Sequence, residues 1–412
     1  MPVPRPKNLD ARQWMLSLVP QGVAVGLSNL LIVLFLATSL HGDVLQVGLL
    51  AGSTSLVLMP SMMFWGWATD RVRRFRPFLV LSFIATGTVL LLIPTAHSAT
   101  ELFILAIVKS VAYAASMPSR QILMAESESH TSWRGGFARL QFLESAGETI
   151  GLGIGFASSS VLGLETQFVL CAALFFTSAL VAAVWVRDPV LIIERRLVGI
   201  ERFANTLVSA SVLVANAHVY ARHTTAGSIR RIFKPTLGFF MVGVFCFSLG
   251  AAALFSPLPV YFIRFYSASS VFLLFFANDL GNTLGYLLVG GIAERARRSL
   301  LLAAALRMLM IPALLLAGGR AGFIADFAVL AVMGGVWALF DVASTCMFLE
   351  LARSGRVGLY GAFAGLGTAA GGLLGGVISM SYGFGVTFAV CSLAYAVALA
   401  TFVLQFKGTS RA

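Results

Sequence analysis

Long apolar runs separated by short polar connections cover most of this chain. The runs reach the length of about 20 residues that an α-helix needs to cross a lipid bilayer. They are continuous, whereas strands of a membrane-spanning barrel would alternate between apolar and polar positions. The pattern therefore predicts twelve membrane-spanning helices. They are expected at residues 13–40, 44–69, 77–97, 100–126, 136–163, 166–186, 235–264, 268–292, 299–318, 322–351, 356–382 and 384–406.

The predicted helices fall into two groups of six, which predicts an all-α membrane protein built from two six-helix bundles. Residues 1–186 form the N-terminal bundle, residues 187–234 a cytoplasmic linker, and residues 235–412 the C-terminal bundle. Within the linker, apolar residues recur at helical spacing between Glu194 and Arg222, and arginines flank them. This pattern predicts an amphipathic helix on the inner membrane surface. The simpler interpretation is that the segment only ties the two bundles together.

The composition excludes a soluble domain. Of the 412 residues, 58% are hydrophobic and 11% are charged, whereas a soluble domain carries about 25% charged residues. The net charge of +12 would suggest nucleic-acid binding in a soluble protein, but in a membrane protein it reflects cytoplasmic loops rich in lysine and arginine. The four cysteines lie far apart within apolar runs, which favours packing over disulfides or metal binding. We therefore expect no nucleic-acid partner and no metal site.

Cations are distributed asymmetrically between the two sides of the predicted bundle. The connections after the second, fourth, sixth, eighth and tenth helices are rich in arginine, and both tails add further cations. The opposite connections hold only Arg264 and Arg320. Because lysine and arginine concentrate on the cytoplasmic side of membrane proteins, we expect both termini in the cytoplasm and a location in the plasma or inner membrane. The first apolar run is too long for a secretory signal.

A short motif occurs at the same place in both halves of the chain. Each copy reads glycine, three residues, an acid, an arginine, one residue and two further arginines. The first copy comprises Gly66, Asp70, Arg71 and Arg74, and the second comprises Gly290, Glu294, Arg295 and Arg298. Matching frames at matching places indicate an internal repeat. The two bundles are therefore expected to be pseudo-symmetric.

The first copy resembles the motif between the second and third helices of the major facilitator superfamily, which reads Gly-x-x-x-Asp-Arg-x-Gly-Arg-Arg/Lys. Arg73 replaces the second glycine, and Phe75 replaces the last basic residue. The resemblance implies a twelve-helix transporter that works by alternating access. A glycine that lets helices approach, followed by charges at the membrane surface, fits a latch that forms in one state and breaks in the other. The simpler interpretation is that the charges only set topology.

Glycines at four-residue spacing give a second sign of duplication. They are Gly147, Gly151 and Gly155 in the fifth predicted helix and Gly367, Gly371 and Gly375 in the eleventh. Small residues at this spacing let helices pack closely and slide. The fifth helix of facilitator antiporters often carries a Gly-Pro pair, but this chain has Gly151-Leu152 at that place. The antiporter signature is therefore absent.

Polar and ionisable residues inside the predicted spans mark candidate coupling or substrate-pathway sites, because such residues are costly in a membrane. They are Asn29, Lys109, Glu144, Glu148, Asp279, Asn282, Arg307 and Asp341. Lys109 is expected to pair with either acid of the fifth helix, and Arg307 with either acid of the second half. Two carboxyls would remain, and a buried carboxylate without a partner tends to take up a proton. The alternative is that the pairs are structural and the remaining acids line a wet cavity.

These features favour a secondary transporter of an unidentified small molecule over an enzyme. The chain has no phosphate-binding loop for ATP, and its histidines fall in the connections, so no zinc-type cluster is indicated. The expected partners are a small-molecule substrate, protons and the lipid bilayer. No cofactor is expected, and the protein is expected to function as a monomer. A non-transporting protein of the same fold, such as a sensor, a scaffold or a lipid scramblase, is the alternative.

Overall fold

The computed structural model describes residues 9–72, 74–127, 133–186, 235–289, 296–317, 322–351 and 357–409. Two predictions from the sequence lie outside these residues. One is the amphipathic linker, and the other is the Gly290, Glu294 and Arg295 part of the second motif copy.

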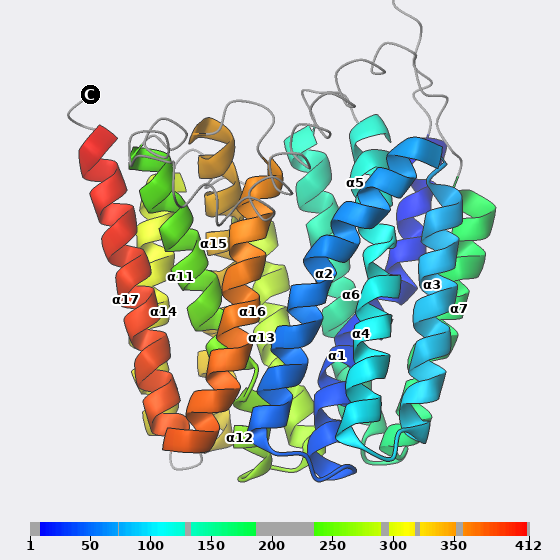
Figure 1. Ribbon diagram of the computed structural model, residues 1–412, viewed down its shortest axis with the longest axis horizontal. Helices are drawn as coiled ribbons and strands as arrows, with labels where there is room; N and C mark the ends of the chain where they lie inside the picture. Colours follow the sequence, from blue (N-terminus) through cyan, green and yellow to red (C-terminus); the bar gives the residue numbers. More distant parts are fainter. Residues whose placement is uncertain are drawn as a thin grey trace, which may run out of the picture.

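The described chain is helical and its helices stand side by side (Figure 1). They are η1 (Leu9–Ser17), α1 (Leu18–Thr38), α2 (Val44–Val72), α3 (Arg76–Leu92), η2 (Ile93–Thr95), α4 (Ala99–Ala114), α5 (Ser116–Ser127), α6 (Trp133–Ser158), α7 (Leu164–Trp185), α11 (Pro235–Phe255), α12 (Leu258–Ile263), α13 (Ala268–Val289), α14 (Ala296–Ala317), α15 (Phe323–Leu351), α16 (Val357–Tyr382) and α17 (Phe384–Thr409). Every predicted span has a counterpart with bounds that agree to within a few residues. Helix η1 and the C-terminal end of α17 lie at the same end of the molecule (Figure 1).

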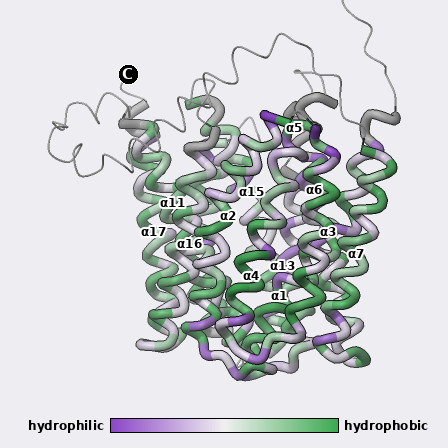
Figure 2. The backbone as a smooth tube through the Cα atoms, turned by 45° about the vertical axis from the view of Figure 1, so that its right-hand side comes forward, coloured by the Kyte–Doolittle hydropathy of each residue, from purple (hydrophilic) through white to green (hydrophobic). Residues whose placement is uncertain are grey.

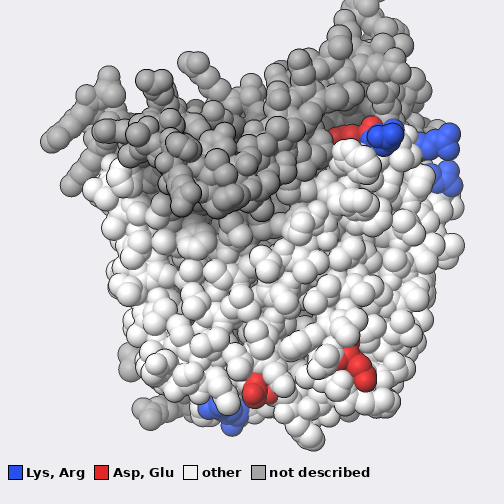
Figure 3. Space-filling model, viewed as in Figure 1, with Lys and Arg blue, Asp and Glu red and all other residues white. Residues whose placement is uncertain are grey.

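The surface of the described chain suits a lipid environment. Eleven of its helices are long and apolar enough to cross a membrane. Hydrophobic positions dominate these helices (Figure 2), and on the face drawn in Figure 3 the charged side chains lie at the two ends of the molecule. Helix α6 is not among the eleven, because Glu144 and Glu148 lower its hydropathy. It nevertheless packs against both α1 and α13, so the least hydrophobic of the long helices in the described chain occupies an internal position.

Helices before residue 187 pack mainly against one another, and so do those after residue 234. In the first part α6 packs on α1, and α3 packs on α7 and α4. In the second part α13 packs on α15, and α11 packs on α16 and α17. The most extensive contacts between the parts are those of α2 with α16 and of α6 with α13, and α12 adds a smaller contact with α1. Glu148 and Asp279 lie on α6 and α13, which form one of these contacts.

Glycines make the closest helix crossings. A Cβ atom at Gly26 of α1 would overlap the backbone of Glu148 on α6, and one at Gly151 would overlap the backbone of Val23. The equivalent glycines of α16 meet α11, where a Cβ at Gly371 would overlap the backbone of Leu249. Close packing at both glycine stripes is therefore confirmed. Without side chains at the crossing, backbones of neighbouring helices approach directly.

A third close helix crossing, between α13 and α15, offers a stability test. A Cβ at Gly334 of α15 would overlap the backbone carbonyl of Asn278 on α13, whereas a Cβ at Gly361 of α16 meets nothing within 4 Å. We expect Gly334→Ala to destabilise the protein by about 1–3 kcal/mol, as overpacked cores do. The control Gly361→Ala should be neutral or slightly stabilising, since alanine favours helix more than glycine does. Thermal unfolding of the purified variants in detergent measures both effects, and equal melting temperatures would contradict the close α13–α15 contact.

Two predicted spans are broken rather than continuous. The span expected at 100–126 is divided at Ala115 into α4 and α5, and Pro118 stands in the first turn of α5. The span expected at 235–264 ends its long helix at Phe255 and resumes as α12 after Ser256 and Pro257. Proline lacks a backbone N–H and disfavours the helical conformation of the residue before it. Both breaks position residues of the polar sites described next.

Candidate functional site

A cavity of about 380 Å³ lies between the two parts of the chain. Residues of α1, α2 and α6 line it on one side, and residues of α11, α13 and α16 line it on the other. Its polar lining residues are Asn29, Ser55, Glu148, Ser256, Asp279 and Thr368. The rest of the wall is formed largely by apolar residues and glycines, including Phe255 and Phe275. The cavity is thus an apolar space with a few polar groups, which is typical of small-molecule sites.

Two carboxyls face this cavity from opposite parts of the chain. Glu148 comes from α6 and Asp279 from α13, and the two interact electrostatically. Neither forms an ion pair with a cation of the described residues. Like charges in a low-dielectric site repel one another. The cavity therefore holds two acids whose charge is not balanced by a neighbouring lysine or arginine side chain.

Lys109 does not pair with either acid of α6, so the sequence-based pairing is wrong. Its Nζ instead donates a hydrogen bond of 2.9 Å to Oδ1 of Asn29. Asn29 lines the cavity, whereas Lys109 is buried behind it on α4 and is not a lining residue. The lysine thereby fixes the orientation of the Asn29 amide. The pairing failed because helical spacing gives the depth of a residue along its helix but not which neighbouring helix its side chain meets.

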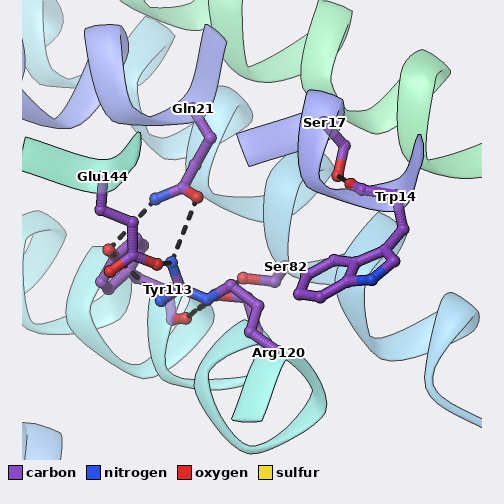
Figure 4. Close-up of polar contacts among 8 residues, drawn as sticks. Trp14, Ser17, Gln21, Ser82, Tyr113, Arg120 and Glu144 are labelled. Atoms are coloured by element: carbon purple, nitrogen blue, oxygen red, sulfur yellow. Dashed lines mark hydrogen bonds and ion pairs between the residues drawn. The ribbon is translucent and has the colours of Figure 1, made fainter. Parts of the chain in front are cut away.

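Glu144 has a partner that the sequence interpretation missed. Arg120 of α5 forms an ion pair with Glu144 and also donates to Oε1 of Gln21 at 3.2 Å. Nε2 of Gln21 donates in turn to the Tyr113 hydroxyl at 3.1 Å, so four helices meet in one network (Figure 4). The Arg120 side chain is 4% exposed and that of Glu144 is 24% exposed. The network therefore consists of an ion pair with a buried arginine and a half-buried glutamate, supported by hydrogen bonds.

Arg307 does not reach Asp279 or Asp341, which corrects the second predicted pairing. Its guanidinium lies 5.4 Å from the ring centroid of Phe255 and 5.9 Å from that of Trp337. Such stacking on aromatic faces is a favourable environment for an arginine. Asp341 is held differently, since it accepts a hydrogen bond of 2.8 Å from the Tyr286 hydroxyl. Arg307 thus contacts a cavity-lining ring from outside the cavity.

A seam of hydroxyl groups joins α6 to α13. Ser145 and Thr283 share a hydrogen bond of 2.7 Å, and Thr149 and Thr283 share one of 2.9 Å. Nδ2 of Asn282 donates to Oγ of Ser145 at 3.4 Å. Asn282 therefore belongs to this seam and not to the cavity lining. The recurrence of polar residues at Glu144, Ser145, Glu148 and Thr149 is a signal in the sequence that could have located this face of α6.

The described part of the motif lies at the end of α2 and the start of α14. Asp70, Arg71, Arg74 and Arg298 are exposed. The guanidinium of Arg71 lies 5.7 Å from the ring of Trp67, and no ion pair of Asp70 occurs among the described residues. A Cβ at Gly66 would lie 3.8 Å from Pro118, which is ordinary contact. The expected close approach at Gly66 is thus not found in this conformation.

The fold and the site define a class, namely a polytopic helical membrane protein with a small-molecule cavity between two sets of helices. The profile of the Major Facilitator Superfamily matches residues 14–352. The chain therefore belongs to this superfamily and is a membrane transporter, not an enzyme.

Solved structures show the same fold. A crystal structure of a mutant of the nucleoside transporter NupG has a TM-score of 0.73 and 15% sequence identity, with 97% of this chain and 100% of that chain covered. The crystal structure of NupG itself gives a TM-score of 0.70 at 15% identity, with the same coverage. At this identity the likeness concerns the fold alone. No curated protein matches the sequence significantly.

Proposed function

We propose that this transporter is a proton-coupled secondary carrier of a small molecule and that Glu148 and Asp279 carry the coupled proton. The observation that supports this most is their position in the cavity without a cationic partner among the described residues. Leaving two such acids ionised in a largely apolar cavity is costly, and protonation removes that cost. When the site opens to water, the acids release the proton.

The proposed cycle is alternating access, in which residues 1–186 and 235–412 form two six-helix halves that rock around the central cavity. The contacts of α2 with α16 and of α6 with α13 join the halves, so these are the contacts that must rearrange. We place the protein in the plasma or inner membrane, with both termini in the cytoplasm. The arginine-rich connections on the same side as the termini support this orientation.

The hydroxyl seam fits such a rearrangement. Hydroxyl–hydroxyl hydrogen bonds such as those of Thr283 with Ser145 and Thr149 are worth only about 1 kcal/mol each. Water can replace them at little cost when the helices separate. Such a contact between the halves stabilises one conformation of the transport cycle but does not prevent its conversion to the other.

Uptake into proteoliposomes tests the proposal. A panel of radiolabelled small molecules is offered with and without an imposed pH gradient. Accumulation above equilibrium that depends on the gradient supports proton coupling. Transport that is equally fast without the gradient and that never exceeds equilibrium would reduce the protein to a facilitator, with the acids serving only to shape the cavity.

The motif at the end of α2 is proposed as a conformational latch, and Asp70 tests it. Asp70→Asn should leave the protein folded but slow transport several-fold, because the carboxylate charge is available for an ion pair in the other state of the cycle. Asp43→Asn is the matched control. It makes the same change at the opposite end of the same helix, where Asp43 accepts the Gln46 N–H at 2.7 Å. Equal uptake by both variants would reduce Asp70 to a topology signal.

A further inference from the structure

The charge of the cavity restricts what it can bind. Glu148 and Asp279 are the only charged residues among those that line it in the described chain. An anionic ligand would meet two carboxyls and no cation. A cationic ligand would meet two acceptors of opposite charge in a site of low dielectric, where such attraction is strong.

The nearby cations are all engaged outside the cavity. Lys109 donates to Asn29, Arg120 pairs with Glu144, and Arg307 stacks on Phe255 and Trp337. The titratable groups that face Glu148 from its own helix and from the neighbouring helices are Asp279, Glu144, Arg120, Tyr113 and Tyr286. Of these only Arg120 is a cation, and Glu144 already neutralises it. The negative charge of the cavity is thus not cancelled locally.

The apolar part of the wall supplies aromatic rings. Phe255 and Phe275 line the cavity, with ring centroids 6.3 Å apart in an edge-to-face arrangement. An aromatic face attracts a cation and also packs against an apolar body. In addition, Oγ of Ser256 lines the same wall and is buried without a hydrogen-bond partner among the described residues. It offers an acceptor for a polar group of a ligand.

From these observations we infer that the cavity binds a small organic cation. Its ammonium group is balanced by Glu148 and Asp279, and its apolar body packs against Phe255 and Phe275. This inference rests on the proposed function, because it assigns a substrate class to the same cavity. It adds a consequence, namely that the cation and the proton compete for the same two carboxyls.

Three probes with one benzyl body test the inference: benzyltrimethylammonium, benzyl alcohol and benzoate. Their binding to the purified, full-length protein is measured by calorimetry in alkaline and in acidic buffer. We expect the cation to bind at least about tenfold more tightly than the alcohol, because it gains an attraction to the two carboxylates of the cavity. Benzoate should bind most weakly. Acidification should weaken binding of the cation and leave that of the alcohol unchanged.

Glu148→Gln and Asp279→Asn sharpen the test. Each should reduce the affinity for benzyltrimethylammonium by about tenfold or more and leave the affinity for benzyl alcohol nearly unchanged. Glu165→Gln is the control, since this acid lies in the first turn of α7 and outside the cavity lining. The comparison of the three probes uses only the wild-type protein. It therefore tests the preference of the cavity for a cation even if a variant does not fold.

Several results would overturn the inference. They are tighter binding of the alcohol or of benzoate, cation binding that survives both substitutions, and binding of none of the probes by the wild-type protein. Failure of the proposed proton coupling has a different signature. In that case the cation binds and both substitutions weaken it, but no pH gradient drives accumulation of any substrate. If a gradient does drive accumulation of another substrate and no probe binds, the cation inference alone fails.

Discussion

Glu148→Gln is expected to abolish pH-driven accumulation in proteoliposomes, while downhill exchange of the same substrate continues at substrate concentrations high enough to offset weaker binding. Glutamine has nearly the size of glutamate and retains hydrogen-bonding groups, so the cavity keeps its shape. It cannot take up or release a proton in the cycle, however. Loss of the proton-carrying group therefore uncouples the pH gradient from the conformational change. The conformational change itself remains possible.

The physical basis is the environment of Glu148. The residue lines the cavity opposite Asp279 and has no ion-pair partner among the described residues. Its backbone is fixed because Gly26 of α1 packs directly against it. A carboxyl that interacts with a second carboxyl and has no ion-pair partner among the described residues favours sharing or taking up a proton. Asp279→Asn is expected to have a similar effect for the same reason.

Glu165→Gln serves as the control for handling and reconstitution, because it removes an acid that does not line the cavity. Uphill accumulation by Glu148→Gln at the wild-type level would exclude this residue as the proton carrier. Asp279 and Asp341 would then remain as candidates. Loss of both accumulation and exchange at saturating substrate, with normal folding, would instead show that transport itself requires Glu148, and not only its coupling to protons.

The second large effect concerns the buried pair of Arg120 and Glu144. Glu144→Gln is expected to destabilise the protein by about 3–5 kcal/mol, as does removal of one partner of a buried ion pair. Arg120→Met should cost less. The Glu144 side chain is 24% exposed, whereas that of Arg120 is 4% exposed, so an unpaired glutamate reaches water more readily than an unpaired arginine.

A double-mutant cycle separates this interaction from other effects of the substitutions. The Arg120→Met/Glu144→Gln double variant should be more stable than Glu144→Gln alone, since no buried charge remains unpaired. Thermal unfolding followed by tryptophan fluorescence gives the four stabilities. Additive effects of the two substitutions would mean that the ion pair contributes nothing to the folded protein.

Most of the helical architecture was predictable from the sequence, because the requirement for about 20 apolar residues per span is strict. Even α6 was expected at nearly its observed place, although two acids lower its hydropathy. The breaks after Ala114 and Phe255 were missed, since both occur inside apolar stretches. Proline alone does not indicate a break, as Pro60 lies inside the continuous helix α2.

The candidate site was predictable in its members but not in its partners. Asn29, Glu148 and Asp279 were singled out by their polarity within spans, and all three line the cavity. Glu144 and Glu148 stand one turn apart, yet one pairs with Arg120 and the other lines the cavity. That difference depends on which helix packs against which face of α6. Such packing is a long-range property that hydrophobic periodicity does not contain.

Infrared spectroscopy of the reconstituted protein tests the central claim most directly, because the C=O stretch of a protonated carboxyl is distinct from the bands of a carboxylate. Spectra are recorded across a pH titration for the wild-type protein, Glu148→Gln and Asp279→Asn. We expect a protonated-carboxyl band that disappears on alkalinisation and loses intensity in each variant. A titrating band that is unchanged in both variants, or the absence of any such band, would show that the cavity acids do not carry the proton.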